Sequence, residues 1–140
     1  MRFMIIVKAN ADSEAGKLPS TQELAEMMTF NEQLVKAGVM LAGEGLLDSS
    51  KGARVTFSAG KAKVVDGPFT EAKELIAGFW IWNVKSKDDA IAWVKRAPFK
   101  DGQLEIRQVF ENADFGKNIT PELKERDERV RGELSKKNAR

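Results

Sequence analysis

The sequence predicts an α+β fold made of one compact domain with a helical extension after it. Short apolar segments rich in β-forming residues alternate with two amphipathic helical patterns, and a hairpin signal interrupts the alternation. The resulting order is strand, helix, strand, hairpin, strand, helix, strand, which matches a ferredoxin-like arrangement with one inserted β-hairpin. A chain of 140 residues can bury a proper core without disulfides.

The first strand is expected at residues 3–8, and the polar segment after it, through Pro19, is expected to be a loop. Ser20 and Glu23 have the spacing of a capping box, which predicts the start of a helix. Gly38 stands where a left-handed C-cap would end that helix. The stripe expected to face the core consists of Leu24, Met27, Met28, Asn31, Leu34 and Val35.

The middle of the chain predicts mostly strands. In order, the expected elements are a strand at 39–42, hairpin strands at 54–57 and 61–65, a helical turn at 70–75 and a strand at 78–84. Gly43-Glu44-Gly45 is expected to be the exit of the first of these strands, where two glycines permit a bulge or the close approach of another group. Asp66-Gly67-Pro68 is expected to end the hairpin.

The second helix is capped by Ser86 and Asp89 and stopped by Pro98, and a last strand is expected at residues 104–111. The core face of this second helix is expected to comprise Ala90, Ile91, Val94 and Ala97. These elements complete the two-helix, antiparallel-sheet pattern.

The strands predict a second subunit. In the first strand Phe3 and Ile5 point to one face while Met4 and Ile6 point to the other, so both faces carry large apolar groups. Two helices cover only one face of a sheet. If the other face were exposed to solvent, it would present an unusually large apolar patch. A homodimer is therefore expected, with a cavity between the sheet and neighbouring elements.

Missing residue types restrict the chemistry, because the chain contains no Cys, no His and no Tyr. Thiolate nucleophiles, serine–histidine triads and His- or Cys-ligated zinc are excluded within one chain. A general base near neutral pH would have to be a carboxylate whose pKa is raised by burial or a lysine whose pKa is lowered by it. No loop has the ligand spacing of a magnesium or calcium site, so neither a metal nor a cofactor is expected.

The net charge of +2 originates in residues 117–140, and the preceding body is nearly neutral. Because the body lacks clustered basic residues, no nucleic-acid partner is expected. No apolar stretch approaches the roughly 20 residues that span a bilayer, and Met1 is followed by no signal-peptide pattern. The expectation is a cytoplasmic protein without a membrane partner.

The tail predicts a helix at residues 120–134, with Thr120 as N-cap and a narrow apolar stripe of Leu123, Val130 and Leu134. Three readings stay open for it. The helix could dock across the dimer, contact another protein, or be a solvated extension.

Two carboxylates are candidate catalytic groups. Asp66 follows an apolar strand and precedes a Gly-Pro that fixes the local path, so burial would make it a usable acid or base. The alternative is that Asp66 caps its own turn, the usual task of Asp at such a site. Glu44, between two glycines, could face a cavity or be a solvated residue in a bulge.

Arg107 lies on the opposite face of its strand from Ile106 and could present its guanidinium to a ligand carboxylate or phosphate. The competing interpretation is a structural ion pair with Asp66, Glu74 or Glu105. The tryptophans Trp80, Trp82 and Trp93 are expected in the core or at the dimer contact.

Three motifs carry a resemblance to a known family. They are Val64-Val65-Asp66-Gly67-Pro68-Phe69-Thr70-Glu71, Gly43-Glu44-Gly45-Leu46 and Glu105-Ile106-Arg107. In these the chain resembles the DGPF-domain proteins, a branch of the YCII-related group, from Met1 to about Glu111. The resemblance implies a dimeric α+β barrel domain at residues 1–115, followed by a helical tail at 116–140.

The resemblance also implies a small-molecule pocket with Asp66 and Glu44 as catalytic candidates. Ligand contacts are expected from Arg107, Phe69, Glu74 and Met27. Many relatives have a histidine paired with an aspartate, but the best-matching position here is near Met27 and has no imidazole. Two classes stay open: an enzyme such as a lyase, isomerase or hydrolase using carboxylate acid/base chemistry, and a non-catalytic ligand-binding or protein-interaction module linked to sigma-factor regulation.

Overall fold

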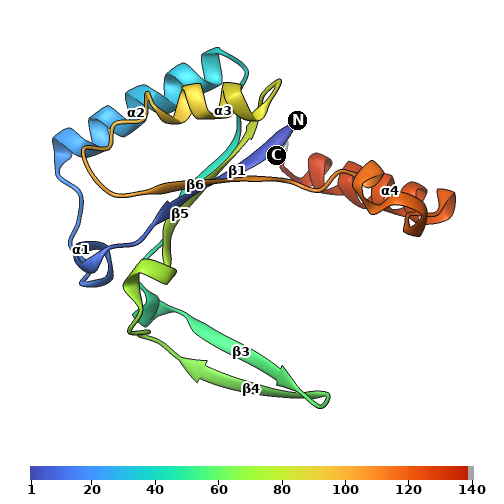
Figure 1. The fold of residues 1–140 in the computed structure, drawn as a ribbon, viewed down its shortest axis with the longest axis horizontal. Helices are drawn as coiled ribbons and strands as arrows, with labels where there is room; N and C mark the ends of the chain where they lie inside the picture. Colours follow the sequence, from blue (N-terminus) through green and yellow to red (C-terminus); the bar gives the residue numbers. More distant parts are fainter. Residues whose placement is uncertain (139–140) are drawn as a thin grey trace. The chain divides into compact units, whose positions relative to one another are not determined.

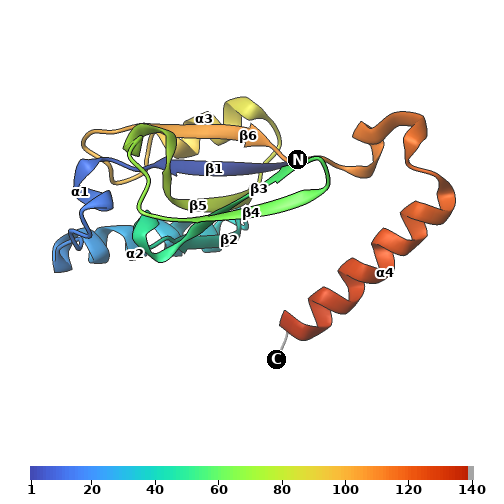
Figure 2. The ribbon, with the colours of Figure 1, turned by 90° about the horizontal axis from the view of Figure 1, so that it is seen from below.

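The structure, a computed structural model, describes residues 1–138. It divides into two compact units, Met1–Gln108 and a second that begins at Val109. The first unit holds the sheet, the hairpin and the helices that precede Gln108. The second holds η3 (Asn112–Asn118) and α4 (Pro121–Asn138), the long helix at the end of the chain in Figure 2.

The first unit is built on a four-stranded antiparallel sheet in the order β2-β5-β1-β6. Its strands are β1 (Arg2–Lys8), β2 (Met40–Gly45), β5 (Ile76–Asn83) and β6 (Leu104–Gln108). The two strands joined through each helix are not neighbours in the sheet: β5 lies between β1 and β2, and β1 lies between β5 and β6. This is the strand order of a ferredoxin-like sheet. The predicted α+β class and topology are confirmed.

Helices α2 (Thr21–Lys36) and α3 (Lys87–Val94) lie on the same side of this sheet (Figure 1). They bury the face of the sheet that carries Trp80 and Trp82, whose exposed fractions are 5% and 0%. The other members of this core are Phe3, Ile5, Phe30, Leu34, Val39, Val84 and Ala90. Burial of the two tryptophans in the core confirms that prediction.

The predicted stripe of α2 was misplaced. Leu34 is buried and Met27 is partly buried, but Leu24, Met28 and Val35 are largely exposed. Phe30, which the stripe omitted, is the other buried side chain of the helix and meets the rings of both core tryptophans edge-on. The apolar face is therefore rotated toward Phe30, because the aromatic core supplies a large partner there.

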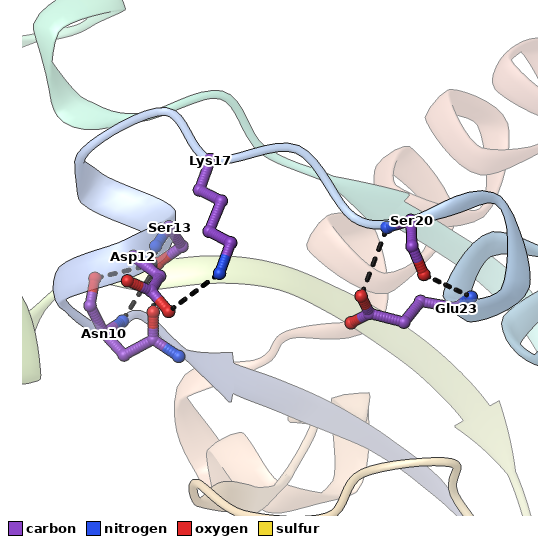
Figure 3. Close-up of polar contacts among 6 residues, drawn as sticks. All are labelled: Asn10, Asp12, Ser13, Lys17, Ser20 and Glu23. Carbon is purple, nitrogen blue, oxygen red and sulfur yellow. Dashed lines mark hydrogen bonds and ion pairs between the residues drawn. The ribbon is translucent and has the colours of Figure 1, made fainter.

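The capping box that starts α2 is as predicted (Figure 3), whereas at α3 only half of the predicted box is seen, with the Ser86 hydroxyl accepting from the Asp89 amide at 3.1 Å. The Ser20 hydroxyl accepts from the Glu23 amide at 3.1 Å, and the Glu23 carboxylate accepts from the Ser20 amide at 3.1 Å. The predicted loop after β1 instead contains a one-turn helix, α1 (Ala11–Glu14), with a reciprocal capping box between Asn10 and Ser13. Gly38 adopts the left-handed conformation (φ +72°) expected at the end of α2.

Strand β2 runs further than predicted. Gly43, Glu44 and Gly45 are not a strand exit but pair with Trp80, Phe79 and Gly78 of β5. The irregularity in this ladder lies near its start, between Met40 and Ala42. Tertiary pairing with the long strand β5 holds the two glycines in the sheet despite their low strand propensity.

The predicted hairpin is confirmed as β3 (Ala53–Ser58) and β4 (Lys61–Asp66), a separate two-stranded sheet drawn clear of the four-stranded one in Figure 1. Ala59 and Gly60 turn the chain with φ of 51° and 77°. Two short 3₁₀ helices, η1 (Ser49–Lys51) and η2 (Ala72–Glu74), lie before and after the hairpin in the sequence.

Within the second unit, α4 begins as predicted, since the Thr120 hydroxyl accepts from the Leu123 amide at 3.2 Å. Phe110 and Phe115 stack at 4.8 Å between centroids. Along residues 109–138 no side chain is fully buried. Among residues 1–138, no helix is both long enough and apolar enough to cross a membrane.

Candidate functional site

A pocket of about 240 Å³ opens between α2 and the end of the sheet where β2 and β5 pair. Its lining comprises Val7, Met27, Asn31, Gly43, Glu44, Gly45, Ala77, Gly78, Phe79, Trp80 and Phe99. The size suits a small molecule of one ring rather than a dinucleotide or a peptide.

Glycines create this hollow. Gly45 pairs with Gly78 across the ladder, so at this point neither strand places a side chain under α2. A Cβ added to Gly45 would meet nothing within 4 Å, whereas a Cβ on Gly43 would lie 2.7 Å from the Trp80 ring. Because glycine weakens a strand interior, two facing glycines favour a role that needs open space or close approach.

Asn31 is the polar side chain that α2 contributes to the pocket wall. The Trp80 indole N–H donates to Asn31 Oδ1 at 2.9 Å, and an indole can only donate, which fixes the orientation of the amide. Among residues 1–138 no protein acceptor takes up the Asn31 NH₂ group. The pocket therefore offers an apolar, aromatic interior with one oriented hydrogen-bond donor.

A second pocket of about 170 Å³ adjoins the first, and the two share Val7, Ala77 and Phe99. Its remaining lining is more polar and comprises Lys8, Asn10, Ser13, Asp101, Gly102, Gln103 and Leu104. Lys8 makes a 3.6 Å ion pair with Glu105. The two hollows together form a groove that is apolar at one end and polar at the other.

Of the predicted site residues, Glu44 and Met27 line the larger pocket. Met27 does so from α2. Glu44 pairs with Phe79, and both neighbours of Glu44 face the helices, so the register places its side chain on the opposite face of the sheet. It is the backbone of Glu44 that borders the hollow, since a Cβ added to Gly78 would lie 2.9 Å from the Glu44 carbonyl oxygen.

Asp66, Phe69 and Glu74 lie outside both pockets. Asp66 is exposed at the end of β4, opposite Ala53, and is therefore not the buried acid that the sequence suggested. Glu74 is exposed on η2. Phe69 is half-buried, with the Arg54 guanidinium 3.9 Å above its ring.

The DGPF turn has a structural explanation. The Ser49 hydroxyl accepts from the Phe69 amide at 2.9 Å and donates to the Glu14 carboxylate at 2.5 Å. A Cβ on Gly67 would lie 1.8 Å from the Ser49 carbonyl oxygen. The alternative in which Asp66 caps this turn is not seen within residues 1–138, because Ser49 takes the Phe69 amide and the Gly52 carbonyl accepts from Gly67.

Arg107 makes the structural ion pair that was one of its two interpretations, with Nη1 3.4 Å from Glu105 Oε2. It faces away from the helices, as predicted, because it pairs with Met4 while Ile106 pairs with buried Ile5. Arg107 and Glu44 lie on opposite edge strands, three strand spacings or roughly 14 Å apart. One small ligand in a single chain cannot contact both.

Sequence reasoning missed Asn31, Phe99 and Gly78 as pocket residues. Asn31 did carry a signal, since it is a polar residue within an otherwise apolar helix stripe. A second signal was the recurrence of glycine in two strands, Gly43 and Gly45 in β2 and Gly78 in β5. Phe99 follows Pro98 in the segment between α3 and β6, and its sequence context gave no signal of a pocket residue.

Comparisons with known proteins place the chain in a family. A family model described as the YCII-related domain matches residues 1–113. An uncharacterised protein of Rhizobium meliloti (strain 1021) is 29% identical over 89 residues, which cover 61% of this chain and 72% of that protein.

Among solved structures, a 5-chloro-2-hydroxyhydroquinone dehydrochlorinase from Burkholderia phenoliruptrix AC1100, in complex with 2,5-dihydroxybenzoquinone, is similar with a TM-score of 0.47 at 17% identity. The match covers 79% of this chain and 95% of that chain. So distant a likeness carries no argument about ligand or reaction. Because the family model spans most of the sequence, the chain belongs to the family of YCII-related domains.

Proposed function

We propose that this protein binds a small, mostly apolar ring compound bearing an oxygen acceptor, in the pocket between α2 and the β2–β5 ladder. The observation that carries the proposal is the facing pair Gly45 and Gly78, which leaves a hollow beneath the oriented amide of Asn31. Trp80 and Phe99, whose rings meet edge-on at 6.5 Å, supply aromatic walls.

The oriented amide selects the ligand chemistry. Asn31 Oδ1 is taken by the Trp80 indole, so the NH₂ group is what remains for a ligand. A carbonyl, carboxylate or phenol oxygen can accept from it, whereas a ligand that offers only donors would leave it unpaired at a cost of about 1–3 kcal/mol. Aromatic acids and amides are the simplest compounds of this class.

The test is the isosteric substitution Asn31→Asp. The carboxylate still accepts from the Trp80 indole but replaces the NH₂ donor with a second oxygen. Benzamide and benzoate are the probes, and binding is followed by the NMR shift of the Trp80 indole N–H. We expect the natural protein to bind both probes and N31D to bind them at least about 10-fold more weakly.

Gln33→Glu is the matched control. Gln33 lies on the same helix, accepts from Arg96 at 3.1 Å and does not line the pocket, so this amide-to-acid change also keeps the acceptor. It should leave probe affinity unchanged. Equal affinities in all three proteins, or no binding of either probe to the natural protein, would overturn the proposed ligand class.

Binding without catalysis is the form of this function that the geometry favours. Glu44 is the one titratable residue in the pocket lining, and its side chain belongs to the opposite face. Carboxylate catalysis by Asp66 and Glu44 stays a second proposal, supported by the presence of Glu44 among the residues that line the pocket. If a probe is transformed, loss of turnover in both Asp66→Asn and Glu44→Gln would support it.

We further propose that the protein is a homodimer. Met4, Ile6, Phe79 and Ile81 form an apolar centre on the face of the sheet that α2 and α3 do not cover. Each of these side chains is partly accessible rather than buried. A second copy packed on this open face would bury them.

A further inference from the structure

The two hollows of the groove meet at a break in the sheet. Both are lined by Val7, Ala77 and Phe99. The ladder between β1 and β5 shifts register here, because Ala77 is an extra residue of β5 between the partners of Val7 and Lys8. Such bulges interrupt regular pairing and are common next to binding and active sites. The small side chain of Ala77 thus stands where one hollow continues into the other.

The hollows reach the size of an ordinary ligand site only together. Their volumes are about 240 and 170 Å³, whereas pockets for small molecules generally measure about 300–1,000 Å³. The ring of Phe99 meets that of Trp80 edge-on in the larger hollow, and Phe99 also borders the smaller one. A compound with its ring against Trp80 can therefore extend an arm past Phe99 into the second hollow.

The second hollow carries an uncompensated negative charge. Its charged lining residues are Lys8 and Asp101. The Lys8 ammonium lies 3.6 Å from Glu105, whose pairing with Ile6 places it on the face of the sheet away from the helices. Among residues 1–138, Asp101 has no ion-pair partner, and Lys100 lines neither hollow. A ligand here therefore meets the charge of Asp101 alone.

The neighbouring polar side chains of this hollow are occupied in the cap of α1. The Ser13 hydroxyl accepts from the Asn10 amide at 2.9 Å and donates to the Asn10 carbonyl at 3.1 Å (Figure 3). Asn10 Oδ1 accepts from the Ser13 amide at 2.8 Å. Asp101 is thus the strongest acceptor that this hollow offers, and a carboxylate forms its strongest hydrogen bonds with a charged donor.

We propose that the second hollow is a subsite for a positively charged arm of the ligand, which Asp101 recognises. This inference rests on the proposed function, since the ring and the oxygen acceptor of the same compound occupy the larger hollow beneath Asn31. The ligand class is an aromatic amide or acid with an ammonium group on a short arm opposite the acceptor. Asp101 is exposed, so its contribution to affinity is modest.

The test combines two probes with two proteins. 4-(Aminomethyl)benzamide carries the ammonium, and 4-ethylbenzamide has nearly the same shape without the charge. Dissociation constants are measured by NMR titration of the Trp80 indole N–H, for the natural protein and for Asp101→Asn, which keeps the size of the side chain. Relative to its effect on 4-ethylbenzamide, we expect D101N to weaken 4-(aminomethyl)benzamide about 3-fold.

Asp88→Asn is the matched control for net charge. Asp88 is exposed on α3 and lines neither hollow. D88N should therefore bind both probes as the natural protein does.

Backbone amide shifts show where the arm lies. Gly102 lines the second hollow but not the first, so its amide resonance should respond to both armed probes and not to benzamide. The subsite would be overturned by a Gly102 amide that ignores the armed probes, by equal weakening of both in D101N, or by equal effects of D101N and D88N.

The outcome for benzamide separates this inference from the proposed function. If benzamide binds and N31D weakens it while the subsite tests fail, the larger pocket keeps its function and only the charged arm is wrong. If benzamide does not bind to the natural protein, both proposals are overturned.

Discussion

At the scale of single residues, glycine and serine explain the family motif better than its acid does. Asp66 is exposed, whereas the glycine that follows it lies so close to η1 that no side chain fits. Ser49 joins the turn to α1 through the Phe69 amide and the Glu14 carboxylate. The motif thus fixes the chain path after the hairpin.

Gly67→Ala is expected to destabilise the protein by about 1–3 kcal/mol, because its Cβ would overlap the Ser49 backbone, which cannot move as a side-chain tip can. Urea denaturation measures the loss. Gly52→Ala is the control, since its Cβ would meet the same Ser49 carbonyl at an ordinary 3.7 Å. Similar stability of G67A and G52A would contradict the steric explanation.

Glu23 gives the fold a dependence on pH. Hydrogen bonds from the backbone and hydroxyl of Ser20 lower the pKa of Glu23 below its usual 4.5. A lowered pKa in the folded state stabilises the protein above the unfolded value, and the benefit is lost as pH falls through the folded pKa.

In Glu23→Gln the amide oxygen can still accept from Ser20 but carries no charge. We expect E23Q to be less stable than the natural protein at pH 7, with the difference shrinking toward pH 3. Urea midpoints at both pH values measure it. A difference that stays constant or grows on acidification would show that the charge of Glu23 does not contribute.

At the scale of elements, β2 decides whether the pocket exists. The same strand that was expected to end before Gly43 continues to Gly45, and the glycine there leaves the hollow open. Gly45→Val should keep the fold, since its Cβ meets no atom within 4 Å and valine suits a strand.

The valine would occupy space that a ligand needs, so we expect G45V to lose benzamide binding by at least about 10-fold with its melting temperature nearly unchanged. Ala42→Val, on the opposite face of β2, is the control and should bind normally. Retained binding in G45V would place the ligand elsewhere.

At the scale of the whole molecule, the proposed homodimer depends on the open face of the sheet. Ile81 pairs with Met4 at its centre. Ile81→Lys should raise the dimer dissociation constant at least about 100-fold, because a lysine ammonium would be desolvated between two apolar faces. Thr29→Lys, exposed on α2, is the control for added charge.

Sedimentation equilibrium of I81K and T29K measures the contribution of this face. A monomeric I81K beside a dimeric T29K would support an interface through the open face. A dimeric I81K would contradict the interface through the open face.

The sequence by itself determined the elements whose signals are local. The capping pair of Ser20 and Glu23, the C-cap Gly38 and the turn of the hairpin each depend on neighbours a few residues away, and each was predicted correctly. Strand alternation likewise predicted that Arg107 faces away from Ile106. Family membership followed from short motifs, and the match over residues 1–113 confirms it.

Only the tertiary structure decided which residues share a pocket. Met27 and Asn31 from α2, Gly45 from β2 and Gly78 from β5 meet because β2 and β5 pair in one register. That register also turns the Glu44 side chain away from the hollow that its backbone borders. A one-residue shift of a strand would exchange its faces, and no local pattern fixes the alignment of two strands so distant in sequence.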